Sequence, residues 1–189
     1  MSTSSKLTRR SVLAGGIFAG GAAFAASSLW PDGTSEPRPL HIPELLDARN
    51  QSQSIGLTAG NGRTEFFQEA ASPTAGYNGS LLGPTVRVHS GDDVEIAVTN
   101  ELNEVTTVHW HGLLIPGELD GGPHQTINPG ETWRPVLPIR QPAATLWYHP
   151  HVHGRTATQV YAGLAGMLIV TDEEEQALGL PSEYGVDDL

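Results

Sequence analysis

Two closely spaced pairs of histidines stand out in this sequence of 189 residues: His109 and His111 in the segment HWH, and His149 and His151 in the segment HPH. Side chains alternate between the two faces of a β-strand, so residues i and i+2 project from the same face, about 7 Å apart. Two such strands lying side by side would direct four imidazoles into one space. Because imidazole binds zinc, copper, iron and nickel, the two pairs predict a transition-metal site.

Spacing alone leaves the number and kind of metal ions open. One zinc ion in a hydrolase is an alternative, although HPHVH lacks the Asp that follows in binuclear zinc hydrolase motifs. His153 continues the period of the second pair, but three ligands on one strand end would spread over about 14 Å. We therefore expect a supporting or structural role for His153, an exposed position for His124, and core or rim packing for Trp110.

The segments around both pairs have the pattern of a β protein. Apolar and polar residues alternate in short runs bounded by turn residues, which predicts strands near 85–89, 94–99, 106–111, 132–137, 145–149 and 167–170. Pro150 lacks a backbone N–H, so the strand before it should end there. One short helix is expected within 155–165. Many short strands separated by regular turns, in a chain with 22 Gly and 14 Pro, predict an all-β Greek-key sandwich.

The first 28 residues have the pattern of an export signal. Arg9 and Arg10 precede a weakly apolar stretch rich in Gly and Ala, which ends in small residues. Adjacent arginines and a weakly apolar core predict a twin-arginine signal over 1–28, cleaved near Ala26, with the export machinery as a partner and the periplasm or cell exterior as the destination. A retained membrane anchor is the alternative, but four glycines within 11–30 make a poor span.

The rest of the chain divides into three segments. Prolines mark 29–52 as a linker or irregular lead-in, the β pattern occupies 53–173, and 174–189 is expected to connect to a further domain. A formal net charge of −11 argues against a nucleic-acid partner. The sequence contains no cysteine, which excludes disulfides and thiolate metal ligands within it.

The residues around the histidines resemble a known family. The segments TVHWHG (107–112) and WYHPH (147–151) closely resemble the first two copper motifs of the multicopper oxidases, which include laccases, bilirubin oxidases and bacterial copper efflux oxidases. Further segments resemble the copper efflux oxidase branch: GYNG (76–79), LGPT (82–85), PGELDGGP (116–123), QPAAT (141–145) and GLAG (163–166). The resemblance extends from about Ile55 to Val170.

This resemblance implies a fold and a set of residue roles. The fold would be a cupredoxin-like, plastocyanin-type β-sandwich, the first of three in the usual enzyme. His109 would bind the type 2 copper ion, and His111, His149 and His151 would bind the type 3 pair. Asp120 occupies the position of an acid that helps to deliver protons during O2 reduction; the alternative for Asp120 is a turn-capping role before two glycines.

The resemblance also implies an activity that needs more than this chain. The family couples one-electron oxidation of a reducing substrate, a small molecule or the cuprous ion, to four-electron reduction of O2 to water. Its type 1 copper requires a cysteine, which lies with four further histidines in a C-terminal domain. We therefore expect the chain to be an N-terminal portion that supplies half of the trinuclear copper ligands, with further cupredoxin domains of the same protein as partners, and to be inactive alone.

A non-enzymatic cupredoxin-fold protein is the alternative function. Some relatives that act in cell division keep the fold but lose the copper ligands. All four histidines of the first-domain motifs are present here, which disfavours this alternative.

Overall fold

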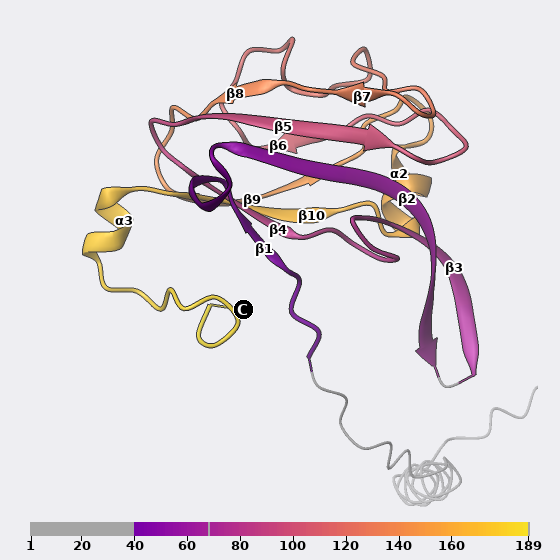
Figure 1. Ribbon diagram of the computed structural model, residues 1–189, viewed down its shortest axis with the longest axis horizontal. Helices are drawn as coiled ribbons and strands as arrows, with labels where there is room; N and C mark the ends of the chain where they lie inside the picture. The colour runs from indigo at the N-terminus through magenta and orange to yellow at the C-terminus, as the bar shows by residue number, and fades with distance from the viewer. Residues whose placement is uncertain (1–39, 68, 189) are drawn as a thin grey trace, which may run out of the picture. The chain divides into compact units, whose positions relative to one another are not determined.

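The strands of this chain form two sheets that face each other. The computed structural model describes residues 40–67 and 69–188, so the predicted export signal and residues 29–39 of the predicted lead-in lie outside the described residues. Within the described residues, each sheet has five strands (Figure 1).

The first sheet contains, in spatial order, β1 (Leu45–Asp47), β4 (Thr85–His89), β10 (Gly166–Thr171), β9 (Ala144–His149) and β6 (His109–His111). The second contains β3 (Ala70–Tyr77), β2 (Ser54–Phe67), β5 (Asp93–Asn100) and β7 (Thr132–Trp133), with β8 (Val136–Pro138) also paired to β5. Three short helices complete the described elements: η1 (Ala48–Gln51), α2 (Thr156–Ala162) and α3 (Glu173–Ala177). None of the helices in the described residues is both long enough and apolar enough to cross a membrane.

The core lies between the two sheets and follows from the alternation of side chains. In β5, Val94, Ile96 and Val98 are fully buried, while the residues between them are partly exposed. In β4, Val86 and Val88 face the same core. These strands thus bury one apolar face against the opposite sheet, as in a β-sandwich. The predicted all-β sandwich is confirmed.

Most of the predicted strands lie where the pattern placed them. The strands expected near 85–89, 94–99, 145–149 and 167–170 are β4, β5, β9 and β10, and β9 ends at His149 before Pro150 as expected. The strand expected over 106–111 is shorter, because only 109–111 pair with β9. The strand expected over 132–137 is divided into β7 and β8, since Pro135 has no N–H for the ladder.

The range expected to be an irregular lead-in is partly folded. Strand β1 pairs in parallel with β4, and a compact unit extends from Ile42 to Leu189. The prolines of this range precede β1 rather than interrupt it. The C-terminal segment also packs against this edge, because the Tyr184 hydroxyl lies 2.8 Å from the carbonyl oxygen of Pro43 and 2.7 Å from Oγ1 of Thr85.

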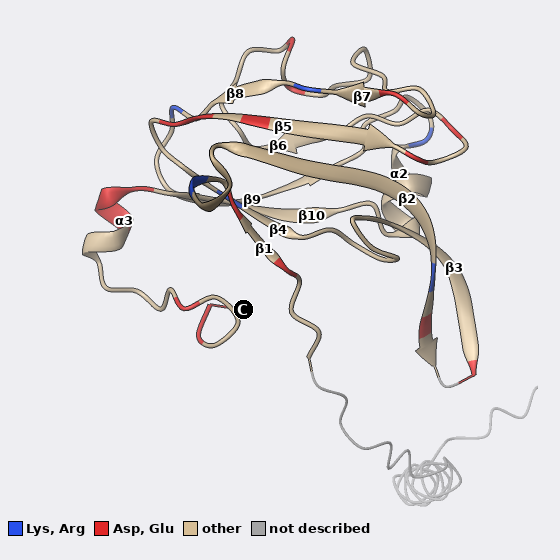
Figure 2. Cartoon of the chain, in the orientation of Figure 1, with Lys and Arg blue, Asp and Glu red and all other residues tan. Residues whose placement is uncertain are grey.

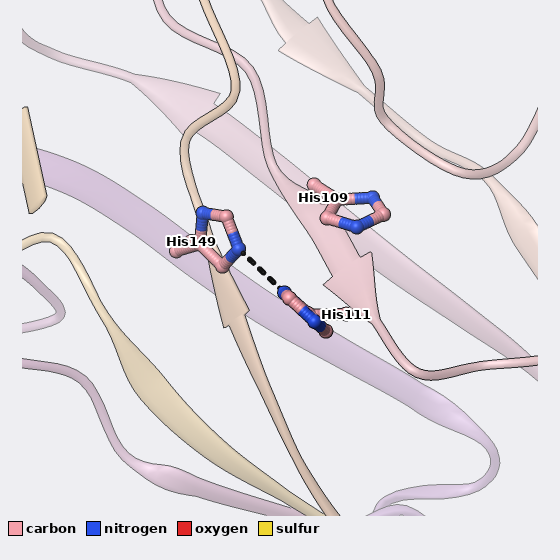
Figure 3. A group of neighbouring side chains, drawn as sticks. All are labelled: His109, His111 and His149. Atoms are coloured by element: carbon pink, nitrogen blue, oxygen red, sulfur yellow. Dashed lines mark hydrogen bonds between the residues drawn. The ribbon is translucent and has the colours of Figure 1, made fainter. Parts of the chain in front are cut away.

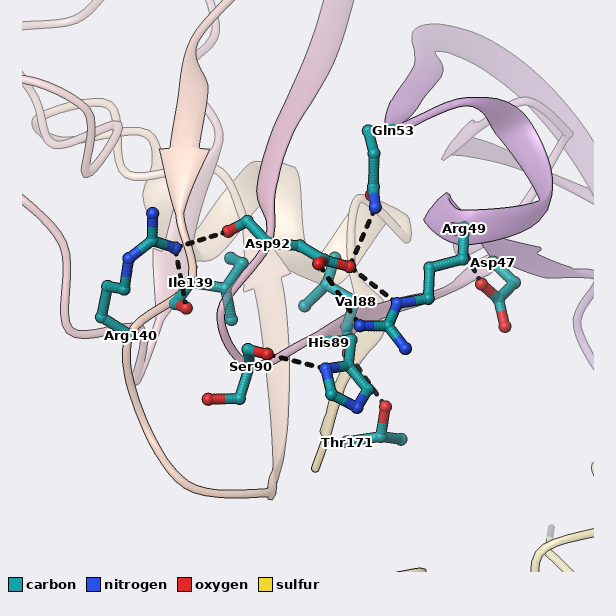
Figure 4. A network of polar contacts seen from close by, with 10 residues as sticks. All are labelled: Asp47, Arg49, Gln53, Val88, His89, Ser90, Asp92, Ile139, Arg140 and Thr171. Atoms are coloured by element: carbon teal, nitrogen blue, oxygen red, sulfur yellow. Dashed lines mark hydrogen bonds and ion pairs between the residues drawn. The ribbon is translucent and has the colours of Figure 1, made fainter. Parts of the chain in front are cut away.

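A polar network fixes the turn between β4 and β5 (Figure 4). The Asp92 carboxylate accepts hydrogen bonds from Nε of Arg49 at 2.8 Å and from Nε2 of Gln53 at 2.9 Å, which ties η1 and the residues after it to this turn. His89 is buried here and its Nδ1 donates to the carbonyl oxygen of Ser90 at 2.7 Å. His89 therefore has a structural contact in a part of the sheet separate from the paired histidines.

Acidic side chains account for the negative charge and gather at a few places. Figure 2 shows them on α3, on the C-terminal segment and on loops at the sheet ends. In α3, Glu173, Glu174 and Glu175 occupy the first turn, where the N-terminal end of a helix favours negative charge. The Asp172 side chain caps this helix by accepting from the N–H of Glu175 at 2.7 Å.

Tyr148, which precedes His149 in the sequence, is closely packed in the core. Its hydroxyl donates to the carbonyl oxygen of Pro84 at 2.7 Å, and the residue is completely buried. A Cβ atom added to Gly166 would overlap the Tyr148 ring, and one added to Gly83 would overlap its hydroxyl. The two glycines therefore leave the space that the tyrosine occupies.

We predict that Gly166→Ala lowers the free energy of unfolding by about 1–3 kcal/mol, because overpacking displaces Tyr148 or the backbone of β10. Gly56→Ala in β2 is the matched control, since an added Cβ there meets no heavy atom within 4 Å; its effect should stay within about 1 kcal/mol. Urea unfolding of both variants measures the difference. Equal losses of stability in the two variants would contradict the close packing of Gly166 against Tyr148.

Candidate metal centre

The two histidine pairs lie on neighbouring strands. Strands β6 and β9 pair antiparallel, with His109 opposite His149 and His111 opposite Trp147. Trp110 and Tyr148, also opposite each other, are completely buried in the core. Because side chains alternate along a strand, His109, His111 and His149 project from the other, outer face of the first sheet.

Three imidazoles converge on this face (Figure 3). His109, His111 and His149 each offer a ring nitrogen, and these atoms lie within 4.8 Å of one another. Nδ1 of His111 and Nε2 of His149 are 3.1 Å apart. Two nitrogens that bind one ion at ordinary distances of about 2.0–2.1 Å are themselves about 3 Å apart, so this pair fits a shared ion.

His151 lies beside this group but follows Pro150, after the strand has ended. Its ring centroid is 5.4 Å from that of His109 and 6.2 Å from that of His149. The structure therefore brings all four predicted ligands together, with three of them in the tighter group. His124 is exposed, as expected. His153 is exposed as well, and within the described residues no hydrogen bond of its side chain supports the role expected for it.

Backbone carbonyl oxygens orient two of the rings. Nδ1 of His109 lies 2.9 Å from the carbonyl oxygen of Asp120, and Nδ1 of His149 lies 2.8 Å from that of Pro150. A carbonyl oxygen only accepts hydrogen bonds, so both rings carry their proton on Nδ1. Each Nε2 then carries the lone pair that could bind a metal, although Nε2 of His149 lies within hydrogen-bond distance of Nδ1 of His111 in this structure. This is the usual arrangement in which a ligating histidine donates its other N–H to an oxygen.

The predicted acid Asp120 also contacts His109. Its Oδ1 atom lies 3.2 Å from Nδ1 of His109, and 35% of its side chain is exposed. The carboxylate thus adjoins both the histidine group and solvent. The sequence predicted this residue but not the contact of its carbonyl oxygen with the same ring.

The site favours neutral imidazole at His149. Burial lowers the pKa of His149, and the neighbouring His109, His111 and His151 lower it further, while the hydrogen bond to the Pro150 carbonyl oxygen acts in the opposite direction. Neutral imidazole is the form that binds metal ions. The donor set, its orientation and its protonation therefore all suit a transition-metal ion.

Comparison with known proteins gives the family. Residues 58–175 match the multicopper oxidases. The chain belongs to the multicopper oxidase family. The resemblance in the histidine motifs and the cupredoxin-like fold are thereby confirmed, and the metal that this family implies is copper.

The chain is similar both to multicopper oxidases and to a cell division protein. A multicopper oxidase of Staphylococcus aureus is 48% identical over 153 residues, which cover 79% of the chain and 34% of the relative. The cell division protein FtsP of Xenorhabdus nematophila is 48% identical over 155 residues, covering 82% and 33%. A solved laccase-like multicopper oxidase, CueO from Ochrobactrum sp., is 46% identical, with a TM-score of 0.75 over 79% of the chain and 33% of the solved one. The chain thus spans about a third of the length of these relatives.

Buried polar side chains hold the two histidine segments of this multicopper oxidase domain together. Oγ1 of Thr107 accepts a hydrogen bond from the N–H of His151 at 2.6 Å. Oγ1 of Thr106 donates to Oε1 of Gln159 in α2 at 3.0 Å, and Nε2 of Gln159 donates to the carbonyl oxygen of Val105 at 2.9 Å. Sequence reasoning missed these residues. Their only signal was polar residues in a segment expected to be a buried strand.

We predict that Thr107→Val lowers the free energy of unfolding by about 1–3 kcal/mol, because valine keeps the shape but leaves the His151 N–H without its acceptor. Hydrogen exchange at the His151 amide should also become faster. Thr99→Val is the control, since the Thr99 hydroxyl pairs at the surface with that of Thr132 at 2.9 Å, and it should change stability by about 0.5 kcal/mol or less. A loss as large in the control would refute the specific role of Thr107.

We also predict that the His149 ring is harder to protonate in the folded chain than in the unfolded chain. Its pKa is lower in the folded chain than in the unfolded chain, where histidine titrates near 6.5. As the pH falls below about 6.5, the unfolded chain binds this proton first, so His149 contributes a loss of stability on acidification. An NMR titration of the His149 ring should give a lower midpoint in the folded chain than in urea. Coincident midpoints would show that the environment has no such effect.

Proposed function

We propose that this chain is the N-terminal copper-binding domain of an exported multicopper oxidase. The carrying observation is the convergence of three imidazole nitrogens within 4.8 Å, in a chain that belongs to this family. In the proposed assignment, His109 binds a type 2 copper ion, and His111, His149 and His151 contribute to a type 3 pair. Further histidines from other domains of the protein complete the trinuclear site.

The proposed reaction couples one-electron oxidation of a reducing substrate, a small molecule or the cuprous ion, to reduction of O2 to water. Copper ions held by these histidines would supply the electron transfer to O2. Four protons are consumed for each O2, so the site needs a path for protons from solvent. The position of Asp120 supports this role, because its carboxylate is partly exposed and lies 3.2 Å from the His109 ring.

Exposed apolar side chains lie beside the histidines on the outer face of the first sheet, which supports the proposal that a partner domain covers this face. Trp147 and Met167 pair across β9 and β10 on this face and are 37% and 42% exposed. Large apolar side chains at the rim of a metal site are suited to burial against another protein surface. We propose that further cupredoxin domains cover this face in the whole protein, which is exported to the periplasm or cell exterior by the twin-arginine pathway.

A role in cell division is the second candidate. Its support is the similarity to FtsP, which matches that to the Staphylococcus aureus oxidase in identity. The four histidines favour the oxidase, because a purely structural domain has no need for three converging imidazoles. Alanine at His109 and His151 in the whole protein separates the two: intact cellular function would favour the structural role, and its loss together with copper would favour the oxidase.

We predict that the 189-residue chain binds Cu(II) through its histidines. Calorimetric titration at pH 7.5 should detect binding, and electron paramagnetic resonance should show nitrogen ligands. His111→Ala and His149→Ala should each weaken binding by more than about tenfold, since removing a ligand costs at least as much as removing a residue that supports one. The chain alone should not consume O2 with phenolic or cuprous substrates.

His153→Ala is the matched control, because His153 is exposed beside the same strand end and should leave the affinity unchanged. Equal effects of His153→Ala and His149→Ala would contradict the proposed site. Tight binding of zinc with no binding of copper would instead favour the hydrolase alternative.

A further inference from the structure

The loop before Gly122 crosses the outer edge of β6. This strand lies at the end of the first sheet and pairs with β9 along one edge only. On its other edge, the N–H of Trp110 donates to the carbonyl oxygen of Asp120 at 3.3 Å. The same oxygen accepts from Nδ1 of His109 at 2.9 Å. One carbonyl oxygen, with two lone pairs, therefore serves both the strand edge and the histidine ring.

Gly121 lets the loop lie this close to the strand. It is buried and has a φ of +70°, in the left-handed region that favours glycine. An added Cβ atom would overlap the carbonyl oxygen of Val108, a backbone atom that cannot move without shifting His109. The next residue, Gly122, is not restricted in this way, because its added Cβ would only reach ordinary contact with Oε1 of Gln125 at 3.5 Å.

We propose that Gly121 is a positioning residue for His109. By allowing close approach of the loop, it places the Asp120 carbonyl oxygen where it holds the His109 ring with the proton on Nδ1 and with Nε2 open to a metal ion. The role of Asp120 is thereby divided: its backbone orients the ring, and its carboxylate, which is partly exposed and lies 3.2 Å from the same Nδ1, is left for proton transfer. The consequence for copper binding rests on the proposed function, whereas the orientation of the ring does not.

The separate roles of the Asp120 carbonyl oxygen and the Asp120 carboxylate can be tested without a metal. Asp120→Ala removes the carboxylate but keeps the carbonyl oxygen, so the His109 tautomer should not change. Gly121→Ala keeps the carboxylate but pushes the loop away, so the Nδ1-protonated form should no longer be the sole tautomer. Gly122→Ala is the control for an added methyl group one position along the same loop.

Long-range proton–nitrogen NMR spectra of the metal-free, 15N-histidine-labelled chain at pH 8 report the tautomer, with His109 assigned from the spectrum of His109→Gln. We expect the Nδ1–H form in the wild type, Asp120→Ala and Gly122→Ala. Gly121→Ala should show a mixture or the Nε2–H form. In a parallel titration with Cu(II), Gly121→Ala should bind more than about tenfold more weakly than Gly122→Ala.

A wild-type chain with the Nε2–H form, or an unchanged tautomer in folded Gly121→Ala, would overturn the proposal. If Gly121→Ala does not fold by circular dichroism, Asp120→Ala decides: retention of the Nδ1–H form supports the carbonyl oxygen as the orienting group, and its loss overturns it. A wild-type chain that has the expected tautomer but binds no copper would refute the proposed function while this inference stands.

Discussion

The antiparallel pairing of β6 with β9 is the constraint on which the metal centre depends. It sets His109 opposite His149 and His111 opposite Trp147. A shift of one residue in this register would turn one strand's histidines towards the core and bring its aromatic residue to the surface. Burial of Trp110 and Tyr148, whose ring centroids are 6.0 Å apart, opposes such a shift. The same two strands therefore hold the core on one face and present imidazoles on the other.

Around this pair, the orientation of the rings comes largely from the backbone. The Asp120 and Pro150 carbonyl oxygens contact ring nitrogens of His109 and His149, and the Thr107 hydroxyl anchors the backbone of His151. A backbone acceptor has no side chain to move, so it holds a ring more rigidly than a long polar side chain would. The Asp120 carboxylate contacts the same nitrogen of His109 at a longer distance, 3.2 Å, than the carbonyl oxygen at 2.9 Å.

Local pattern was sufficient to predict the strands with clear alternation and the position of each histidine pair on one face of its strand, since both depend on neighbours along the chain. The meeting of the two pairs depends on the pairing of β6 with β9, which no local pattern determines. It could not predict β1, because that strand is only three residues long and is defined by its pairing with β4. The strand expected over 132–137 is divided into β7 and β8 because of the position of Pro135 beside β5, and this too depends on tertiary structure. At the site, the histidines and Asp120 could be identified from their motifs. The contact of the Asp120 carbonyl oxygen and the closeness of Gly121 to Val108 could not, because they arise where a loop meets a strand distant in sequence.

The contact of Tyr184 with Pro43 has a consequence for how the domain folds. These two residues are 141 positions apart, yet they meet at one edge of the first sheet. Parallel pairing of β1 with β4, and of β10 with β4, adds further contacts between distant segments. Such topologies fold slowly, because the entropy of closing long loops is lost before the contacts can compensate it. During synthesis, the first sheet can be completed only after β10 has left the ribosome, because β10 lies between β4 and β9 and joins the two parts of the sheet.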